Sequence, residues 1–188
     1  MGVVAAKVRM ATHTSAGYAD DMIRLLVLDV DGVLTDGGLF YGPDGEQLKR
    51  FSVRDGLGIK LLQQSGVVVA IVSGRSSPAL ARRAAELGIS ELHAGVGDKS
   101  VILADLQARL GMDAGETAAM GDDLPDLALF AGAALRIAPA DAEPELIAVA
   151  DIVTPRTGGH GAVRDAARHI LALDGKPDST APATATHG

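Results

Sequence analysis

Short apolar runs alternate along most of the chain with longer segments that begin at helix-capping residues. Four apolar runs are predicted to be buried strands of a parallel sheet: Ile23–Val30, Val67–Val72, Thr117–Met120 and Ala134–Ala138. Shorter strands are predicted at Glu91–His93 and Ile152–Val153. The longer segments are predicted helices, which start near Asp55, Ser76 or Ser77, Asp98, Asp123, Pro144 and Ala162. This alternation predicts an α/β fold, a Rossmann-like parallel sheet with helices on both faces.

The stretch between the first strand and the first helix has a different pattern. Gly38–Gly42 and Glu46–Val53 flank Pro43-Asp44-Gly45, a strong turn signal, so we predict a small β-hairpin. With Phe51, it holds most of the few aromatic residues of the chain, Phe40 and Tyr41 among them. Such residues suit a contact surface between chains, and packing on the hairpin's own sheet is the alternative.

Composition narrows the domain organisation and the partners. The 188 residues suffice for one α/β domain, which we place at 22–174, between a disordered leader (1–21) and a disordered tail (175–188). A net charge of −7 argues against nucleic acid or an anionic membrane as the main partner. The absence of cysteine excludes disulfides and a cysteine nucleophile, and fits a cytoplasmic protein. No apolar run is long enough for a membrane span or a signal peptide.

Four polar clusters lie at the end of a predicted strand or the start of a predicted helix: Asp29–Thr35, Ser73–Arg75, Asp98-Lys99 and Gly121–Asp123. In an open parallel sheet these positions converge on one crevice at the carboxyl ends of the strands. Carboxylates suit a hard divalent cation such as Mg²⁺, and the cationic and hydroxyl groups suit a phosphoryl group. The sequence therefore predicts a site for phosphoryl chemistry there.

Each cluster also has a simpler structural explanation. Asp31-Gly32 is compatible with a turn, Ser73 with a loop contact, and Asp122-Asp123 with a helix cap. Lys99 is more informative, because a lysine in the first helical turn opposes the helix dipole unless an anion is near. Asp29 follows an apolar strand, where a carboxylate is costly without a cation or donors.

The motifs together resemble those of haloacid-dehalogenase-like hydrolases. The run DVDGVLT at Asp29–Thr35 is similar to the first motif, and Ser73, Lys99 and the GDD at Gly121–Asp123 are similar to the second, third and fourth. Further segments resemble the branch of this family that acts on 3-deoxy-D-manno-octulosonate 8-phosphate: FSVRDGLGIK at Phe51–Lys60, SGR at Ser73–Arg75 and GGHGAVRD at Gly158–Asp165.

The resemblance implies a Mg²⁺-dependent phosphatase that works through an aspartyl phosphate. Asp29 would be the nucleophile, ionised at neutral pH without help. Mg²⁺ would be held by Asp29, the backbone carbonyl of Asp31 and Asp122. Asp31 would be the general acid and base, which favours phosphoryl transfer over dehalogenation because a halide needs no proton. Ser73 would hydrogen-bond the phosphoryl group, and Lys99 would add positive charge.

The resemblance also implies which residues contact an acidic sugar phosphate, whose carboxylate and phosphate arginine can grip in a bidentate way. The implied contacts are Asp31, Ser52, Val53, Arg54, Asp55, Gly56, Lys60, Arg75, Arg83 and Lys99. A solvent-exposed helix face is an equal alternative for Arg83, and a loop ion pair is an alternative for Arg54.

No cap domain is expected, because the chain between Thr35 and Ser73 and between Ser73 and Lys99 is filled by the predicted elements. A capless site is open to water. The resemblance implies a homotetramer in which neighbouring chains complete each active site. Gly158–Gly161 resembles a flexible segment that closes over a site, although a simple loop is also possible.

Three other functions are alternatives. The first is a phosphatase for a nonulosonate 9-phosphate, which Arg75 and the GGHGAVRD segment weakly disfavour. The second is a non-catalytic oligomeric scaffold, which the intact set of Asp29, Asp31, Lys99 and Asp122 argues against. The third is a phosphate-accepting response-regulator domain, in which the acidic pair comes early rather than late in the chain.

Overall fold

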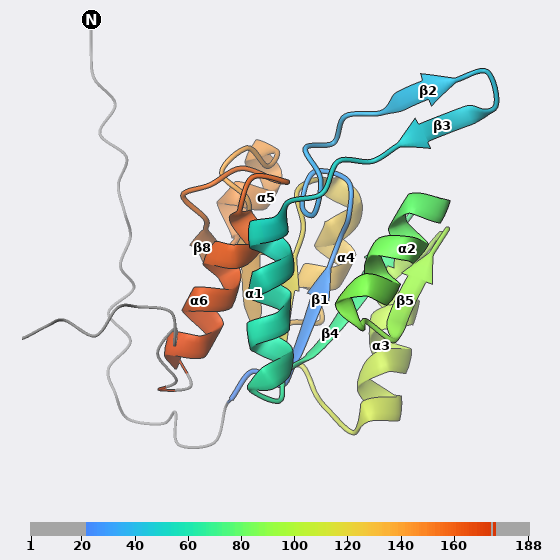
Figure 1. The fold of residues 1–188 in the computed structure, drawn as a ribbon. Helices are drawn as coiled ribbons and strands as arrows, with labels where there is room; N and C mark the ends of the chain where they lie inside the picture. Colours follow the sequence, from blue (N-terminus) through green and yellow to red (C-terminus); the bar gives the residue numbers. More distant parts are fainter. Residues whose placement is uncertain (1–21, 174, 176–188) are drawn as a thin grey trace, which may run out of the picture.

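The computed structural model describes residues 22–173 and 175, so the predicted leader and nearly all of the predicted tail lie outside the described residues (Figure 1). Six parallel strands form one sheet in the order β5-β4-β1-β6-β7-β8. Their bounds are β1 Leu25–Leu28, β4 Val68–Ser73, β5 Glu91–Ala94, β6 Thr117–Met120, β7 Leu135–Ala138 and β8 Ile152–Val153. The predicted strands are confirmed: β6 and β8 have the predicted bounds, and the ends of the other four lie within two residues of the predicted ones.

Helices cover both faces of this sheet, as predicted (Figure 1). Along β1, Leu26 and Leu28 pack on one side and Leu25 and Val27 on the other, because successive side chains of a strand point to opposite faces. The first side is covered by α1 Val53–Gln64, α2 Pro78–Leu87 and α6 Ala162–Leu173. The second is covered by α3 Lys99–Leu110, α4 Leu127–Phe130, which follows the 3₁₀ turn η1 Leu124–Asp126, and α5 Pro144–Val149.

A separate two-stranded hairpin, β2 Phe40–Gly42 and β3 Gly45–Leu48, follows the end of β1. It projects from the body on the side where β1 finishes (Figure 1). Phe40, Tyr41 and Leu48 are exposed, whereas Phe51 is partly buried against the main core. Between β1 and β4 the chain forms only this hairpin and α1, and between β4 and α3 only α2 and β5. No cap domain is inserted at either place.

The predicted cap of α1 is wrong, and the reason lies in a long-range contact. Ser52 caps the helix, because its hydroxyl accepts hydrogen bonds from the backbone N–H groups of Arg54 and Asp55. Asp55 turns inward instead. Its carboxylate, in a residue only 1% exposed, accepts from the N–H groups of Gly161 and Arg164.

The segment Gly158–Gly161, which precedes α6, is packed against the loop after β1. In the described structure it is therefore not a free flap over the site. The Gly159 N–H donates to the Val33 carbonyl at 3.0 Å. A Cβ atom at Gly158 would lie 1.8 Å from the carbonyl oxygen of Gly32, so only glycine allows the backbones to approach this closely. The segment therefore braces the loop that carries Asp29 and Asp31.

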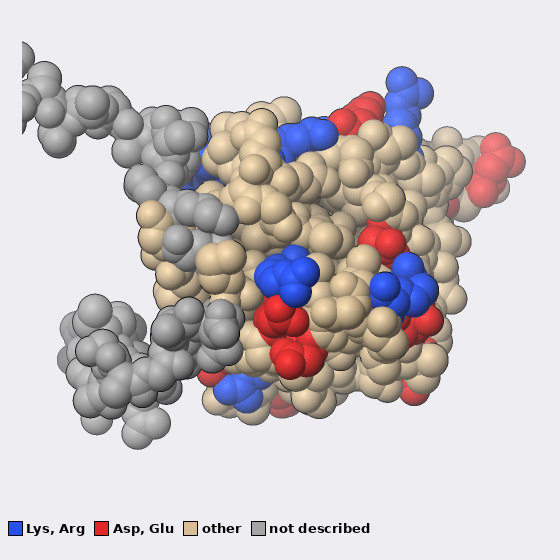
Figure 2. Space-filling model, turned by 90° about the horizontal axis from the view of Figure 1, so that it is seen from below, with Lys and Arg blue, Asp and Glu red and all other residues tan. Residues whose placement is uncertain are grey.

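On the side away from the hairpin, acidic and basic side chains lie next to each other rather than in patches of one sign (Figure 2). Among the described residues, no helix is long and apolar enough to cross a lipid bilayer.

Candidate active site

The predicted site residues meet at the carboxyl ends of the central strands. Asp29 directly follows β1, Ser73 is the last residue of β4, and Asp122 lies two residues past the end of β6. These strands are neighbours in the sheet, in the order β4-β1-β6. Lys99 is the first residue of α3, whose cap is Asp98, as predicted. The sheet topology therefore brings together residues that are far apart in the sequence.

Asp29 and Lys99 form a buried ion pair. The Lys99 Nζ lies 2.6 Å from Asp29 Oδ1 and 2.6 Å from Asp126 Oδ1, and both Asp29 and Lys99 are only 7% exposed. Burial and the neighbouring Asp126 raise the pKa of Asp29 to about 6, against the opposing effect of Lys99. Burial lowers the pKa of Lys99, but the charges of Asp29 and Asp126 outweigh it and raise this pKa overall. Lys99 therefore keeps its positive charge beside the candidate nucleophile.

Asp29, Asp122 and Asp126 form a cluster whose carboxylate oxygens lie within 4.8 Å of one another. Burial, followed by the charges of Asp29, Asp126 and Asp123, raises the pKa of Asp122 to about 8. The Asp122 Oδ1 is buried and has no hydrogen-bond partner among the described residues. An unpartnered buried oxygen in a group of carboxylates fits a hard divalent cation, which takes oxygen ligands.

Asp126 was missed by the sequence analysis. Its Oδ2 accepts from the backbone N–H of Asp122 at 3.0 Å, while Oδ1 accepts from Lys99. Asp123 caps η1 through the N–H of Leu124, which leaves Asp122 to face Asp29. Asp122 and Asp126 lie one helical turn apart at the start of a predicted helix, and this spacing could have indicated that their side chains are close together.

Gly32 allows the first and fourth motifs to approach. Its φ is +90°, and a Cβ atom there would lie 1.9 Å from the Asp122 carboxylate. Any other residue would therefore be strained and would also displace Asp122.

Asp31 stands apart from the carboxylate cluster, because two cations hold its side chain on the hairpin side. Lys49 Nζ contacts Asp31 Oδ1, and Arg75 Nε lies 3.7 Å from Asp31 Oδ2. Lys49 was not among the predicted site residues, and no local motif marks it. Ser73 is 1% exposed, and its hydroxyl accepts from the N–H of Arg75.

Some residues predicted to contact substrate lie near Asp31 or at the start of α1. Arg75 lies beside Asp31 with its side chain 44% exposed, and Arg83 donates to the carbonyl of Ser52, the cap of α1, at 3.2 Å. The N-terminal part of α1, with Val53, Arg54 and Gly56, lies near Arg83, and a Cβ atom at Gly56 would meet the Arg83 guanidinium. Their substrate contacts stay predictions.

Two of the predicted substrate residues have their charged groups engaged elsewhere in this chain. The carboxylate of Asp55 binds backbone N–H groups at the start of α6. The Lys60 Nζ donates to the Leu87 carbonyl at 2.6 Å, at the C-terminal end of α2. The opposite end of α2 follows Arg75, so Lys60 is not brought to the carboxylate cluster of its own chain.

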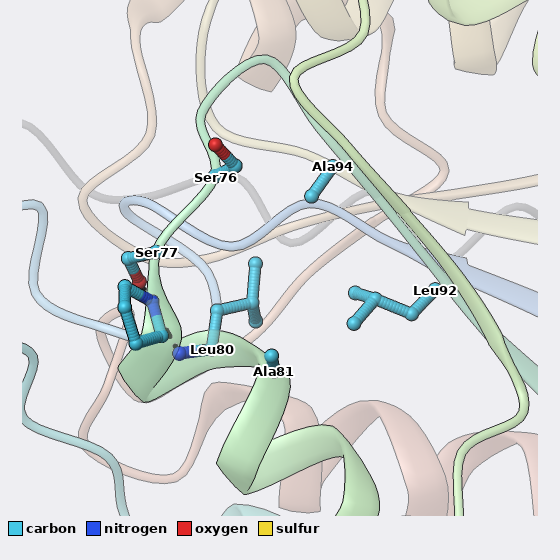
Figure 3. A pocket seen from close by; sticks show the side chains of 7 residues that line it. Ser76, Ser77, Leu80, Ala81, Leu92 and Ala94 are labelled. Atoms are coloured by element: carbon cyan, nitrogen blue, oxygen red, sulfur yellow. Dashed lines mark hydrogen bonds between the residues drawn. The ribbon is translucent and has the colours of Figure 1, made fainter.

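A cavity of about 290 Å³ lies between the start of α2 and β5. Figure 3 shows Leu80 and Ala81 on the helix, Leu92 and Ala94 on the strand, and Ser76 and Ser77 on the connecting segment. None of the clustered carboxylates lines this cavity.

Comparison with known proteins agrees with this geometry. The profile of the haloacid dehalogenase-like hydrolases matches residues 91–165. The chain is 45% identical over 156 residues to 3-deoxy-D-manno-octulosonate 8-phosphate phosphatase KdsC of Escherichia coli, covering 83% of each chain.

Solved structures of similar proteins have the same fold. The cobalt-bound octulosonate 8-phosphate phosphatase of Haemophilus influenzae has a TM-score of 0.81 and 44% identity, covering 83% of this chain and 91% of that one. The Moraxella catarrhalis phosphatase in complex with a magnesium ion, a phosphate ion and KDO has a TM-score of 0.78 and 43% identity, covering 81% and 88%. By fold, motifs and identity over most of its length, this chain belongs to the 3-deoxy-D-manno-octulosonate 8-phosphate phosphatase family of haloacid-dehalogenase-like hydrolases.

Proposed function

We propose that this chain is a Mg²⁺-dependent phosphatase that hydrolyses 3-deoxy-D-manno-octulosonate 8-phosphate to the free sugar acid and inorganic phosphate. The observation that carries the proposal is the arrangement around Asp29. A buried carboxylate is paired with Lys99, joined to two further carboxylates, and followed two residues on by Asp31, which lies outside that cluster. The nucleophile and the proton carrier are thus two different carboxylates at the same edge of the sheet.

In the first half of the reaction, an oxygen of the Asp29 carboxylate bonds to phosphorus while the bond to the sugar oxygen breaks. Asp31 gives a proton to that leaving oxygen. In the second half, Asp31 takes a proton from a water molecule whose oxygen attacks the phosphorus of the aspartyl phosphate. Phosphate leaves, and Asp29 is restored.

Lys99 and Ser73 support the transferred group. The Lys99 ammonium lies against Asp29 and provides fixed positive charge where negative charge concentrates. The hydroxyl of Ser73, at the end of β4, is available to donate to a phosphoryl oxygen, since its observed hydrogen bond uses it as an acceptor.

Asp29, Asp122 and the Asp31 backbone carbonyl would hold Mg²⁺, with Asp126 orienting Asp122 and Lys99. A bound cation would reduce the repulsion between the ionised Asp29 and the phosphate. The orphaned Asp122 Oδ1 and the raised pKa of Asp122 support a cation at this place.

For the substrate's carboxylate we propose Arg75. Its guanidinium lies 2.9 Å from Glu46 and beside Asp31, and its side chain is 44% exposed. Arg83, through the Ser52 segment, shapes the start of α1 nearby. A bidentate arginine distinguishes an acidic sugar phosphate from a neutral one.

The function is tested by phosphate release from octulosonate 8-phosphate, a nonulosonate 9-phosphate and glucose 6-phosphate, with Mg²⁺ or with EDTA. The expected result is Mg²⁺-dependent release with the highest kcat/KM on the octulosonate. A higher kcat/KM on the nonulosonate 9-phosphate would make that compound the proposed substrate. No phosphate release from any of the three would contradict the proposal that the chain is a phosphatase.

We further propose that one folded domain at 22–174 assembles as a cytoplasmic homotetramer, with neighbouring chains completing each open site. The exposed Phe40, Tyr41 and Leu48 of the hairpin support this, because clustered apolar side chains on a projecting element suit an interface. Light scattering of the full chain at micromolar concentration should give four times the chain mass, and Leu48→Asp should lower it. A monomeric mass for the unmodified chain would refute the tetramer.

A further inference from the structure

The hairpin delivers a buried lysine to the active site. Lys49 directly follows β3, and its side chain is only 1% exposed. Its Nζ contacts Asp31 Oδ1 and lies 3.3 Å from Glu46 Oε1. A buried ammonium is costly unless its charge is paired, and here two carboxylates pair it.

Arg75 completes a closed set of four charges. Its Nη2 lies 2.9 Å from Glu46 Oε2 and its Nε lies 3.7 Å from Asp31 Oδ2. Each oxygen of Asp31 thus faces a cation, and Glu46 joins the two cations to each other. Hydrogen bonding to Arg75 lowers the pKa of Glu46, so its negative charge is secure. The four residues come from the loop after β1, from the hairpin with the segment that follows it, and from the loop after β4.

This set explains why Asp31 stays out of the carboxylate cluster. Asp31 is two residues from Asp29, yet the cluster consists of Asp29, Asp122 and Asp126. A bound cation would attract the Asp31 carboxylate as it attracts the others. Lys49 gives that carboxylate a fixed partner on the opposite side, which holds it outside the cluster.

We propose that Lys49 is a positioning residue of this phosphatase: it holds the Asp31 carboxylate where it can protonate the leaving oxygen, and Glu46 holds Lys49 in turn. The proposal rests on the proposed function, in which Asp31 is the general acid. It gives the hairpin a role in catalysis within its own chain, separate from any role between chains.

The test uses substrates whose leaving groups differ in how much they need a proton. These substrates lack the sugar carboxylate, so a displaced Arg75 cannot affect the result through substrate binding. The series runs from p-nitrophenyl phosphate through phenyl phosphate to an alkyl phosphate. The kcat/KM value reports the steps up to departure of the leaving group, so the later use of Asp31 as a base does not enter. Asp31→Asn serves as the reference.

For Lys49→Met in the full chain with Mg²⁺, we expect kcat/KM to fall about tenfold or more further on the alkyl phosphate than on p-nitrophenyl phosphate, following the trend of Asp31→Asn. Lys49→Arg should recover part of the loss. Arg24→Met removes an ion pair with Glu116 at the amino ends of the strands and should behave as the unmodified protein. An equal loss across the series, or no loss, would overturn the role of Lys49.

Circular dichroism and thermal melting establish whether Lys49→Met folds. If it does not, Glu46→Gln decides: the same trend at smaller amplitude supports the proposal, and a flat response refutes it. If Asp31→Asn itself shows no dependence on the leaving group, the proposed role of Asp31 fails. A trend in Asp31→Asn that is absent from the Lys49 and Glu46 variants refutes the positioning role alone.

Discussion

The Lys99 Nζ lies 2.6 Å from Asp29 Oδ1 and 2.6 Å from Asp126 Oδ1, so one buried ammonium joins the candidate nucleophile to the 3₁₀ turn η1. Removing it leaves two buried carboxylates without their cation. For Lys99→Met we expect kcat to fall at least about a hundredfold and the free energy of unfolding in EDTA to fall by about 3 kcal/mol. Steady-state kinetics and urea denaturation measure the two effects. Unchanged kcat would remove Lys99 from the mechanism.

Asp126 should control the affinity for Mg²⁺. In Asp126→Asn an amide replaces a carboxylate that accepts from both Lys99 and the N–H of Asp122, so Asp122 loses its support. We expect the Mg²⁺ concentration for half-maximal activity to rise by about 10- to 100-fold. Asp123→Asn is the matched control: it removes the same charge near Asp122, but Asp123 accepts from neither Lys99 nor the N–H of Asp122, so the Mg²⁺ requirement should stay within about twofold of the unmodified protein. Equal effects of the two substitutions would refute a specific role for Asp126.

Alanine substitutions at Gly32 and Gly66 separate the effect of backbone strain from the effect of a steric clash with Asp122. Both have positive φ, but only at Gly32 would a Cβ atom meet the Asp122 carboxylate, whereas it meets nothing within 4 Å at Gly66. Substitution by alanine should cost about 1–3 kcal/mol of unfolding free energy at either position. Only Gly32→Ala should abolish the rise in melting temperature that Mg²⁺ produces. A full Mg²⁺ response in Gly32→Ala would mean that Asp122 moves away without losing the cation.

The stability of the protein in EDTA should fall as the pH rises from about 4 to about 8. Folding raises the pKa of Asp29 from 3.8 to about 6 and that of Asp122 from 3.8 to about 8. Between the unfolded and folded pKa values the folded state binds more protons, so rising pH favours unfolding. Mg²⁺ stabilises the ionised carboxylates and should flatten this dependence. Denaturation midpoints at several pH values, with EDTA and with Mg²⁺, check the sign; stability in EDTA that rises across this window would contradict it.

The sequence predicted the features that depend on local patterns. The start of α2 at Ser76 or Ser77, the Asp98 cap and the turn at Pro43–Gly45 were placed correctly, and the four motif clusters lie at strand ends or helix starts as predicted. The parallel sheet followed from strand–helix alternation, and it alone was enough to bring Asp29, Ser73, Lys99 and Asp122 together.

The features that were missed depend on contacts between distant segments. Asp55 was predicted to cap α1, but the approach of α6 offers its carboxylate two backbone N–H groups. Glu46 lies on the hairpin and Lys49 directly follows it. No local sequence pattern predicts that this part of the chain contacts Asp31. The Lys60 side chain points to the C-terminal end of α2, where its Nζ donates to the Leu87 carbonyl, away from the carboxylate cluster.

Asp29 as the nucleophile is the central claim, and it is tested most directly by phosphate release from octulosonate 8-phosphate in the presence of Mg²⁺ by the unmodified chain and by Asp29→Asn. The asparagine is nearly the same size but cannot form the aspartyl phosphate. We expect release by the unmodified chain, loss of release on adding EDTA, and no detectable release by Asp29→Asn with an unchanged circular dichroism spectrum. Turnover by a folded Asp29→Asn protein at a rate near that of the unmodified chain would contradict the mechanism.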